Sequence, residues 1–276
     1  MKHYYILALL VFSVADTLYA QNESENDGPV MKSVKESMYK PKNGQLKARE
    51  SLFDDGLNTI IIYDKNGDMT EIRRFEDYGV LIETTYYERN KAGKAIEGMV
   101  IDQSEIVKNY WTCQYNSDNK LIEVLSYNSD DRLIQIQNNT YDANGNLIVM
   151  SMSDPDRNPQ WKHEYKYNAK NQKIEQLRYL RDGSLKDRRT YEYNKDGQEV
   201  AQYKFNSKDD GYTKFVSTYD EMGNLIIQNW FDETGKQTHQ TTFEYVYDPY
   251  GNWISKRRGS DGKLNMVWER EIEYYD

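Results

Sequence analysis

The chain is poor in the residues that carry most enzyme and metal chemistry. Its 276 residues include one cysteine, Cys113, and three histidines, of which only His163 and His239 lie beyond the first twenty positions. A single cysteine excludes an internal disulfide, and so few Cys and His side chains are a poor supply for a zinc site or a Cys–His nucleophile. We therefore expect no metal, no cofactor and no catalytic residue, and we predict that the protein is not an enzyme.

Basic charge, long apolar runs and helical periodicity are also scarce. The formal net charge is −9, which disfavours nucleic acid and anionic membrane surfaces as partners. Mean hydropathy is −0.95, and no segment after the N-terminus is apolar over enough residues to form a membrane helix. The five prolines lie in the N-terminal part or in predicted turns, and no window sustains a 3.6-residue period. These absences favour an all-β chain.

Residues 1–20 have the pattern of an export signal. A short polar start is followed by the apolar run Ile6–Phe12 and then by Ala20, where a signal peptidase could cut. The next segment, residues 21–37, is polar and short of aromatic residues, which is typical of a flexible leader. We predict one repeat domain over residues 38–276, an exported protein (periplasmic, cell-surface or secreted), and no membrane insertion after signal removal.

Tyrosine is abundant, and it marks an internal repeat. The segment Tyr219–Ile226 (YDEMGNLI) recurs as Tyr141–Ile148 (YDANGNLI) and Tyr247–Ile254 (YDPYGNWI). The step between register tyrosines is 26 residues and later 28, and Arg89 takes one register position where the tyrosine is missing. The register tyrosines are Tyr63, Tyr115, Tyr141, Tyr167, Tyr193, Tyr219 and Tyr247, and the turn glycines are Gly67, Gly145, Gly197, Gly223 and Gly251. A fixed period of a few tens of residues indicates a repeat architecture.

Each unit predicts two strands and two tight turns. Asp or Asn at the start of a turn can accept a bond from the backbone two residues on, and Gly supplies the positive φ that closes it. Return strands end in alternating Tyr-x-Tyr, as at Tyr165 and Tyr167, which indicates one packed face. We predict an all-β antiparallel hairpin repeat that forms a twisted or curled sheet, or a β-solenoid-like meander. Whether the sheet closes on itself is left open, and an open sheet would have edge strands that need covering.

The repeated Tyr-Asp-x-x-Gly-Asn-Leu-Ile segment, with Tyr-x-Tyr before it, resembles the YD-repeat (RHS-repeat) family of exported bacterial proteins. The resemblance covers roughly residues 39–276 and is strongest at Tyr141, Tyr219 and Tyr247. It implies a spiral of β-hairpins, which in large members encloses a toxin domain and in others is linked to carbohydrate or cell-surface binding. This chain would be a short member without a toxin domain.

The tryptophans are the candidate binding residues. Rows of aromatic rings on a curved sheet can stack sugar rings or a partner's apolar side chains, whereas packing between repeats is the alternative interpretation of each ring. The register tyrosines and turn glycines are interpreted as structural, because they follow the period of the fold. The binding candidates are Trp111, Trp161, Trp230 and Trp253.

These observations predict an exported, non-enzymatic interaction scaffold at the cell envelope or outside the cell. An envelope or extracellular protein would bind its curved face or its free strand edges. The alternative is a carbohydrate-binding module for an envelope or extracellular polysaccharide. A hydrolase ranks third, because carboxylates are scattered through the chain and nothing singles out a catalytic pair.

Overall fold

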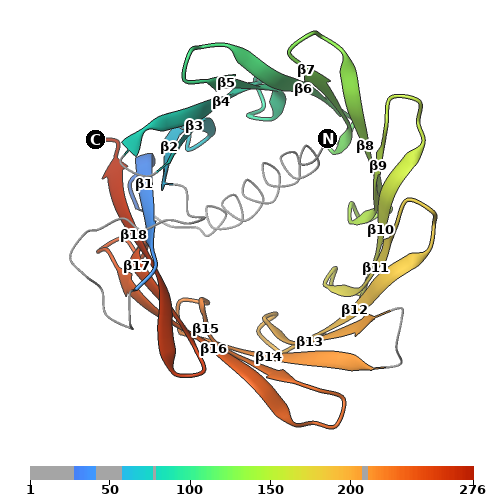
Figure 1. Ribbon diagram of the computed structural model, residues 1–276, viewed down its shortest axis with the longest axis vertical. Coiled ribbons are helices and arrows are strands. Elements are labelled where there is room, and N and C mark those ends of the chain that lie inside the picture. Colours follow the sequence, from blue (N-terminus) through green and yellow to red (C-terminus); the bar gives the residue numbers. More distant parts are fainter. Residues whose placement is uncertain (1–27, 42–57, 77–78, 207–210) are drawn as a thin grey trace.

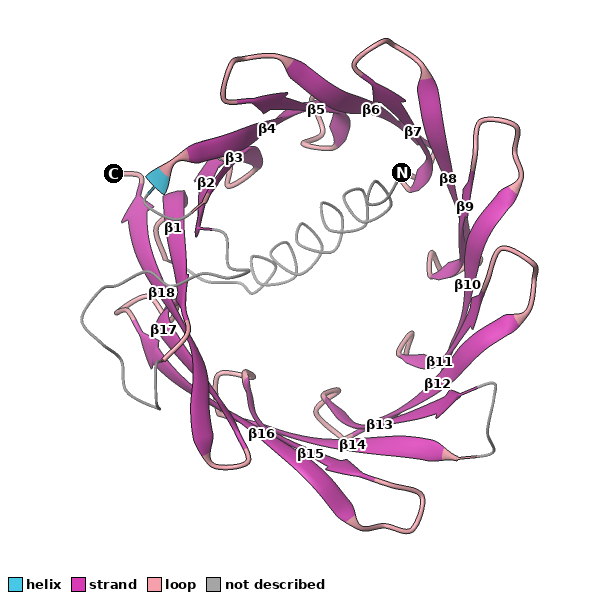
Figure 2. Cartoon of the chain, in the orientation of Figure 1, coloured by secondary structure: helices cyan, strands magenta, loops and turns pink. Residues whose placement is uncertain are grey.

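The computed structural model describes residues 28–41, 58–76, 79–206 and 211–276, so the export signal predicted at residues 1–20 lies outside the described part. Antiparallel strands joined by hairpins make up this part, which confirms the all-β meander (Figure 2). No helix in the ranges just given is long and apolar enough to cross a bilayer.

The strands are β1 (Met31–Tyr39), β2 (Asn58–Tyr63), β3 (Met69–Phe75), β4 (Leu81–Arg89), β5 (Ala95–Asp102), β6 (Val107–Tyr115), β7 (Leu121–Asn128), β8 (Leu133–Tyr141), β9 (Leu147–Ser153), β10 (Pro159–Tyr167), β11 (Lys173–Tyr179), β12 (Leu185–Tyr193), β13 (Glu199–Asn206), β14 (Tyr212–Tyr219), β15 (Leu225–Phe231), β16 (Gln237–Tyr247), β17 (Trp253–Ser260) and β18 (Lys263–Tyr274).

The sheet closes into an 18-stranded barrel (Figure 1). The open twisted sheet and the solenoid-like meander expected from the sequence are therefore corrected. Strand β1 makes the closure, because it pairs antiparallel with β18 on one side and with β2 on the other. Since each strand adds twist to its neighbour, a long meander curls until its ends meet. Every described strand thus has partners on both sides, which removes the free strand edges proposed as a binding route.

The closing strand also changes the domain boundary. Residues 21–37 were assigned to a flexible leader, but β1 begins at Met31, inside that segment. Its sequence, MKSVKESMY, is polar because only part of it faces packed side chains: Val34 is 3% exposed, whereas Lys32 and Lys35 are exposed. The domain therefore starts earlier than position 38.

The hairpin turns form two rims. Turns that follow the register positions lie toward the middle of the ring in Figure 1, and the second turn of each unit lies around its outside. We call these the narrow rim and the wide rim. The register turns and several wide-rim turns, such as the one at Asp102, use one design, in which a side-chain oxygen accepts from the backbone two and four residues on. For example, Asp142 Oδ1 accepts from Asn144 N at 2.9 Å and from Asn146 N at 2.8 Å. This confirms the predicted turn chemistry.

The fourth position of every described register turn has positive φ. Glycine occupies it in most register turns, with φ of 83° at Gly67 and 81° at Gly145. Asparagine takes this position in two of the weaker copies, at Asn119 (φ 57°) and Asn171 (φ 59°). A type I turn followed by a left-handed residue makes a three-residue hairpin loop with a bulge. The ladder register shifts at these turns accordingly.

The register tyrosines link each unit to the one before it through their hydroxyl groups. Tyr193 donates to the carbonyl oxygen of Lys173 at 2.7 Å, and Tyr141 donates to that of Leu121 at 2.9 Å. Tyr115, Tyr167 and Tyr219 make the same bond to the residue twenty positions earlier. The accepting carbonyl belongs to the residue at the register shift, where a bulge interrupts the ladder. The hydroxyl therefore explains why the repeat uses Tyr and not Phe.

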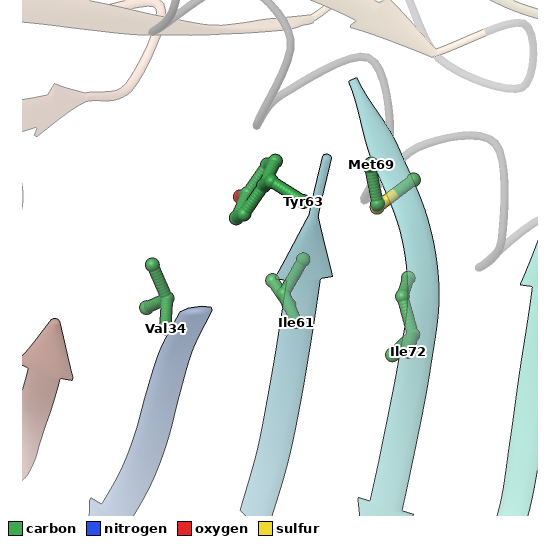
Figure 3. Packing of buried hydrophobic residues seen from close by; sticks show 5 residues of the cluster. All are labelled: Val34, Ile61, Tyr63, Met69 and Ile72. Carbon is green, nitrogen blue, oxygen red and sulfur yellow. The ribbon is translucent and has the colours of Figure 1, made fainter. Parts of the chain in front are cut away.

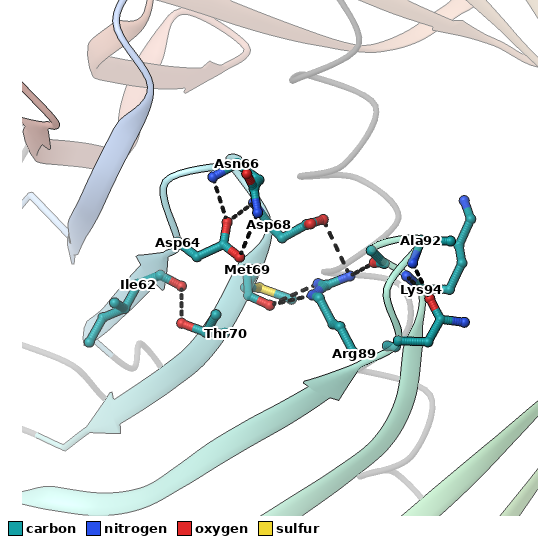
Figure 4. Close-up of polar contacts among 12 residues, drawn as sticks. Ile62, Asp64, Asn66, Asp68, Met69, Thr70, Arg89, Ala92 and Lys94 are labelled. Carbon is teal, nitrogen blue, oxygen red and sulfur yellow. Dashed lines mark hydrogen bonds and ion pairs between the residues drawn. The ribbon is translucent and has the colours of Figure 1, made fainter.

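Arg89 takes over this bond where the tyrosine is missing. Its Nε and Nη2 donate to the carbonyl oxygen of Met69 at 3.0 and 2.8 Å, again twenty residues earlier (Figure 4). At the other end of the chain, Tyr275 donates to the carbonyl oxygen of Tyr63 at 2.6 Å, across the closing strand. The 28-residue step alters the acceptor: Tyr247 donates to Asp220 Oδ2 at 2.7 Å instead of to a carbonyl.

We expect Tyr193→Phe to lower the free energy of unfolding by about 1 kcal/mol, because a part-buried carbonyl loses its donor. Tyr127→Phe is the matched control, since Tyr127 acts by stacking on Tyr110 with ring centroids 4.8 Å apart. Denaturant titration of both variants measures the difference. Equal losses in the two would show that the hydroxyl bond does not stabilise the repeat.

The two faces of the wall differ in chemistry. Because side chains alternate along a strand and opposed residues share a face, the ladder registers assign each residue to one face. On β12 the face with the register tyrosines, here called the register face, carries Asp187, Arg189 and Tyr191, and Asp187 and Tyr191 are buried. The other face, the charged face, carries Arg188 and Glu192, which are exposed.

Apolar packing on the register face is concentrated in two clusters. Figure 3 shows the first, which joins the closing strand to the start of the repeat: Val34, Ile61, Tyr63, Met69 and Ile72. The second contains Val100, Trp111 and Val124. The apolar core thus consists of two separate clusters along the wall.

Candidate functional site

The structure divides the four candidate tryptophans into two pairs. Trp111 is 6% exposed; it lies over Gly98 and meets the ring of Tyr87 edge-on. Trp253 is 9% exposed and lies beneath the guanidinium of Arg270, which is 3.4 Å from the ring centroid. These two rings are engaged in packing and present little surface to a ligand. Trp161 and Trp230 are half-buried, and they remain the candidates.

Each remaining tryptophan lies beside a histidine near the wide rim. The ring centroids of Trp161 and His163 are 4.6 Å apart, and those of Trp230 and His239 are 5.0 Å apart. His239 Nδ1 is 2.6 Å from Asp261 Oδ2. The two pairs come from β10 and from β15–β16, so the barrel does not bring them together.

Trp161 has arginines near it on the register face, whereas the charged residue that adjoins the Trp230–His239 pair is Asp261. The ladder places His163 opposite Arg178 and Arg178 opposite Asp187. In the next row Tyr165 is opposite Gln176, Gln176 is opposite Arg189, and Arg189 is opposite Lys204. We call this set the β10–β13 patch: Trp161, His163, Tyr165, Gln176, Arg178, Asp187, Arg189, Tyr191 and Lys204.

Asp187 is the buried centre of the patch. It is 2% exposed, and Arg178 donates to both of its carboxylate oxygens, with Nε–Oδ1 at 2.7 Å. Arg189 Nε lies 3.7 Å from Asp187 Oδ1, which is beyond hydrogen-bond range. Burial opposes the charged carboxylate, but the bonds and charge of Arg178 and the charge of Arg189 hold the pKa of Asp187 below its ordinary value. The carboxylate is therefore ionised at neutral pH.

His163 is neutral in the same surroundings. Burial and the nearby charge of Arg178 lower the pKa of His163 to about 4, because both disfavour the imidazolium. The patch thus gains no cation from histidine at neutral pH, and its positive charge comes from Arg and Lys side chains.

This shift predicts acid sensitivity. The unfolded histidine binds a proton near its ordinary pKa of about 6.5, whereas the folded one does so only near about 4. The contribution of His163 to stability is therefore full above about pH 6.5 and is lost as pH falls toward 4. We expect His163→Gln to flatten the fall in unfolding free energy across this window, measured by denaturant titration at each pH. An unchanged slope would contradict the neutral assignment.

The barrel contains an internal comparison for the patch. Arg74 and Glu83 lie four 26-residue periods before Arg178 and Asp187, and they pair in the same way, with Arg74 Nη1 2.6 Å from Glu83 Oε1. There Lys108 Nζ donates to the second carboxylate oxygen at 2.6 Å, and Thr85 takes the place of Arg189. The earlier site is thus a closed ion pair, while the later one carries an extra guanidinium.

Sequence reasoning singled out Trp161 but missed its charged neighbours. Arg178, Asp187 and Arg189 lie on two strands, and their meeting depends on the ladder register. The sequence did contain a signal for these neighbours. The register positions recur from unit to unit, but the residues at the positions nearest the wide rim change: Arg74 and Glu83 in one unit correspond to Trp230 and His239 in another. Varied positions on a repeated frame are where a repeat protein carries its specific contacts.

Comparison with known proteins gives distant structural likenesses. No protein family matches the chain, and no curated protein matches it. A porin-like protein from Bacteroides uniformis is 10% identical over 89% of this chain and 98% of its own, with a TM-score of 0.46. A porin-like protein from Bacteroides vulgatus is 9% identical over 90% and 99%, with a TM-score of 0.34. The Photorhabdus luminescens Tc holotoxin pore is 12% identical over 77% of this chain and 14% of its own, with a TM-score of 0.36.

Likeness at this level carries no argument about function. YD-repeat membership stays a prediction from the sequence, because no match names that family.

Proposed function

We propose that this protein is an exported, non-enzymatic interaction scaffold that acts in the cell envelope or outside the cell. One observation carries the proposal: each unit combines recurring residues that build the wall with varied residues near the wide rim. The Tyr193–Lys173 bond belongs to the first kind and the Trp230–His239 pair to the second. A partner would bind a face or a rim, since closure leaves no described strand edge free.

Carbohydrate binding is the second candidate, and the half-buried Trp161 and Trp230 favour it. A partly exposed indole can stack on a sugar ring while its buried edge holds the orientation. Trp111 and Trp253 no longer support this function, because packing covers them.

A pull-down of the chain from Gln21 against envelope extract, with and without soluble polysaccharide, tests both candidates. A partner that polysaccharide does not displace supports the scaffold, and retention that polysaccharide competes away supports glycan binding. Trp161→Ala should weaken glycan retention, while Tyr110→Ala, which removes a half-buried ring from the charged face, should not. Retention of nothing in either arm would contradict both candidates.

We further propose that the barrel acts outside the bilayer. A membrane barrel needs an apolar lipid-facing band, but charges occur on both faces: Glu269, Glu271 and Glu273 lie exposed on the charged face of β18, and Asp187 lies on the register face. Release of the expressed protein without detergent is the expected result. Retention in membranes after an alkaline carbonate wash would contradict it.

A further inference from the structure

We propose that Arg189 is the centre of a subsite for an oxyanion carried by a sugar ring, so that the β10–β13 patch binds an acidic polysaccharide. This inference rests on the second candidate function and specifies its ligand. Three observations on the register face carry it: an unsatisfied guanidinium group, a local excess of positive charge, and adjacent aromatic rings.

The guanidinium of Arg189 is incompletely paired. Its Nε is buried and has no hydrogen-bond partner among the described residues, and its ion-pair contact with Asp187 is long, at 3.7 Å. Asp187 already receives two bonds from Arg178. A buried donor without a partner is costly, and Asp187 does not supply the missing partner at this distance. The side chain as a whole is 27% exposed, so an anion in solution can approach it.

The charge around Arg189 favours an anion. Arg178, Arg189, Lys204 and Lys173 are the cations on the register face of β11–β13, and Asp187 and Glu199 are the carboxylates. The neighbouring register-face residues of β10 and β14 are uncharged: Trp161, His163, Tyr165 and Tyr167 on β10, and Thr213, Phe215, Ser217 and Tyr219 on β14. The patch therefore holds two more positive than negative charges, although the whole chain carries −9. Guanidinium forks bind carboxylate and sulfate-like oxyanions through paired N–H donors.

The aromatic rings define what carries the anion. Tyr191 is 7% exposed, and its hydroxyl donates to Gln176 at 2.9 Å, so this ring is fixed beside Arg189. Trp161 is half-buried and packs against His163. Trp161 and Arg189 lie two strands and two ladder rows apart, so the proposed ligand is a polymer in which one sugar ring stacks on the indole while the oxyanion of another pairs with the guanidinium.

The equivalent site four periods earlier lacks the second guanidinium. At that site Thr85 occupies the position of Arg189. Lys108 donates to the second carboxylate oxygen of Glu83 and so completes its pairing. Both cations of the earlier site thus bond to Glu83, whereas in the β10–β13 patch only Arg178 bonds to Asp187 and Arg189 does not.

Arg189→Gln is the test variant, and Arg188→Gln is its matched control. The two residues are adjacent on β12, and both changes remove one positive charge, but Arg188 lies on the charged face and pairs with Glu175. Affinity is measured by calorimetry with polygalacturonate, dextran sulfate and neutral dextran. Arg178 is avoided, because its loss would leave the buried Asp187 unpaired. Denaturant titration establishes that both variants are folded.

We expect the wild-type chain to bind polygalacturonate, dextran sulfate or both in preference to dextran, and Arg189→Gln to weaken that binding about tenfold or more. Arg188→Gln should stay within about twofold of wild type. Arg189→Lys, which keeps the charge but loses the fork, should fall between them. A response to one polyanion alone identifies carboxylate or sulfate as the source of the oxyanion.

Equal effects of the two Gln variants would overturn the inference, since binding would then reflect overall charge. Dextran binding as tight as polyanion binding, unchanged in Arg189→Gln and lost in Trp161→Ala, would also overturn it while leaving glycan binding in place. Binding of none of the three polymers overturns the inference as well, and the envelope pull-down then judges the scaffold proposal separately.

Discussion

Replacing Trp111 with Ala is expected to lower the free energy of unfolding by about 3–5 kcal/mol, the range for truncating a large buried aromatic ring. The ring is 6% exposed and packs with Val100 and Val124, so its removal leaves a cavity in the second core cluster. Denaturant titration measures the loss. Trp161→Ala is the comparison, and its smaller cost follows from its half-buried ring. Equal losses would contradict the division into packing and binding tryptophans.

Gly98 supplies an independent control for this packing. A Cβ atom at Gly98 would lie 1.9 Å from Cζ2 of Trp111, so Gly98→Ala must displace the ring and should cost about 1–3 kcal/mol. In the Trp111→Ala background the same change should cost close to nothing, because the obstructing ring is gone. Additive losses in the double variant would show that the indole does not lie over Gly98.

Arg270→Ala is expected to cost roughly 3 kcal/mol, because the change removes one partner of a largely buried ion pair together with a cation–π contact. Arg270 is 10% exposed, donates to Glu36 Oε2 at 2.8 Å and covers Trp253. Glu36 lies on β1 and Arg270 on β18, so the pair holds the strands that close the barrel.

Arg257→Ala removes the same charge from an exposed position on the neighbouring strand β17 and should change stability by less than about 0.5 kcal/mol. Unfolding of both variants is followed by tryptophan fluorescence and by far-ultraviolet circular dichroism. If Arg270→Ala proves as mild as the control, the Glu36–Arg270 pair does not stabilise the closure.

The local design of this protein was readable in its sequence because the causes are local. An Asp or Asn followed by a residue with positive φ closes each register turn, as Asp142 and Gly145 show, and these groups lie within a few positions of one another. The register tyrosine recurs from Tyr115 to Tyr219 because each of these units has an acceptor carbonyl twenty residues earlier. The turn sequence after Arg89 was enough to predict that Arg89 occupies a register position. Its hydrogen bond to the carbonyl oxygen of Met69 was seen only in the structure.

Tertiary structure alone decided the closure and the composition of the patch. Glu36 and Arg270 are 234 residues apart, and nothing near Met31 in the sequence signals a strand that pairs with the end of the chain. Arg178, Asp187 and Arg189 meet because the bulges at the turns set the ladder register, and a shift of one residue would send each side chain to the other face. The period of the sequence thus determined the hairpin unit from which the barrel is built. Long-range strand pairing determined the shape of the barrel and which residues surround Trp161.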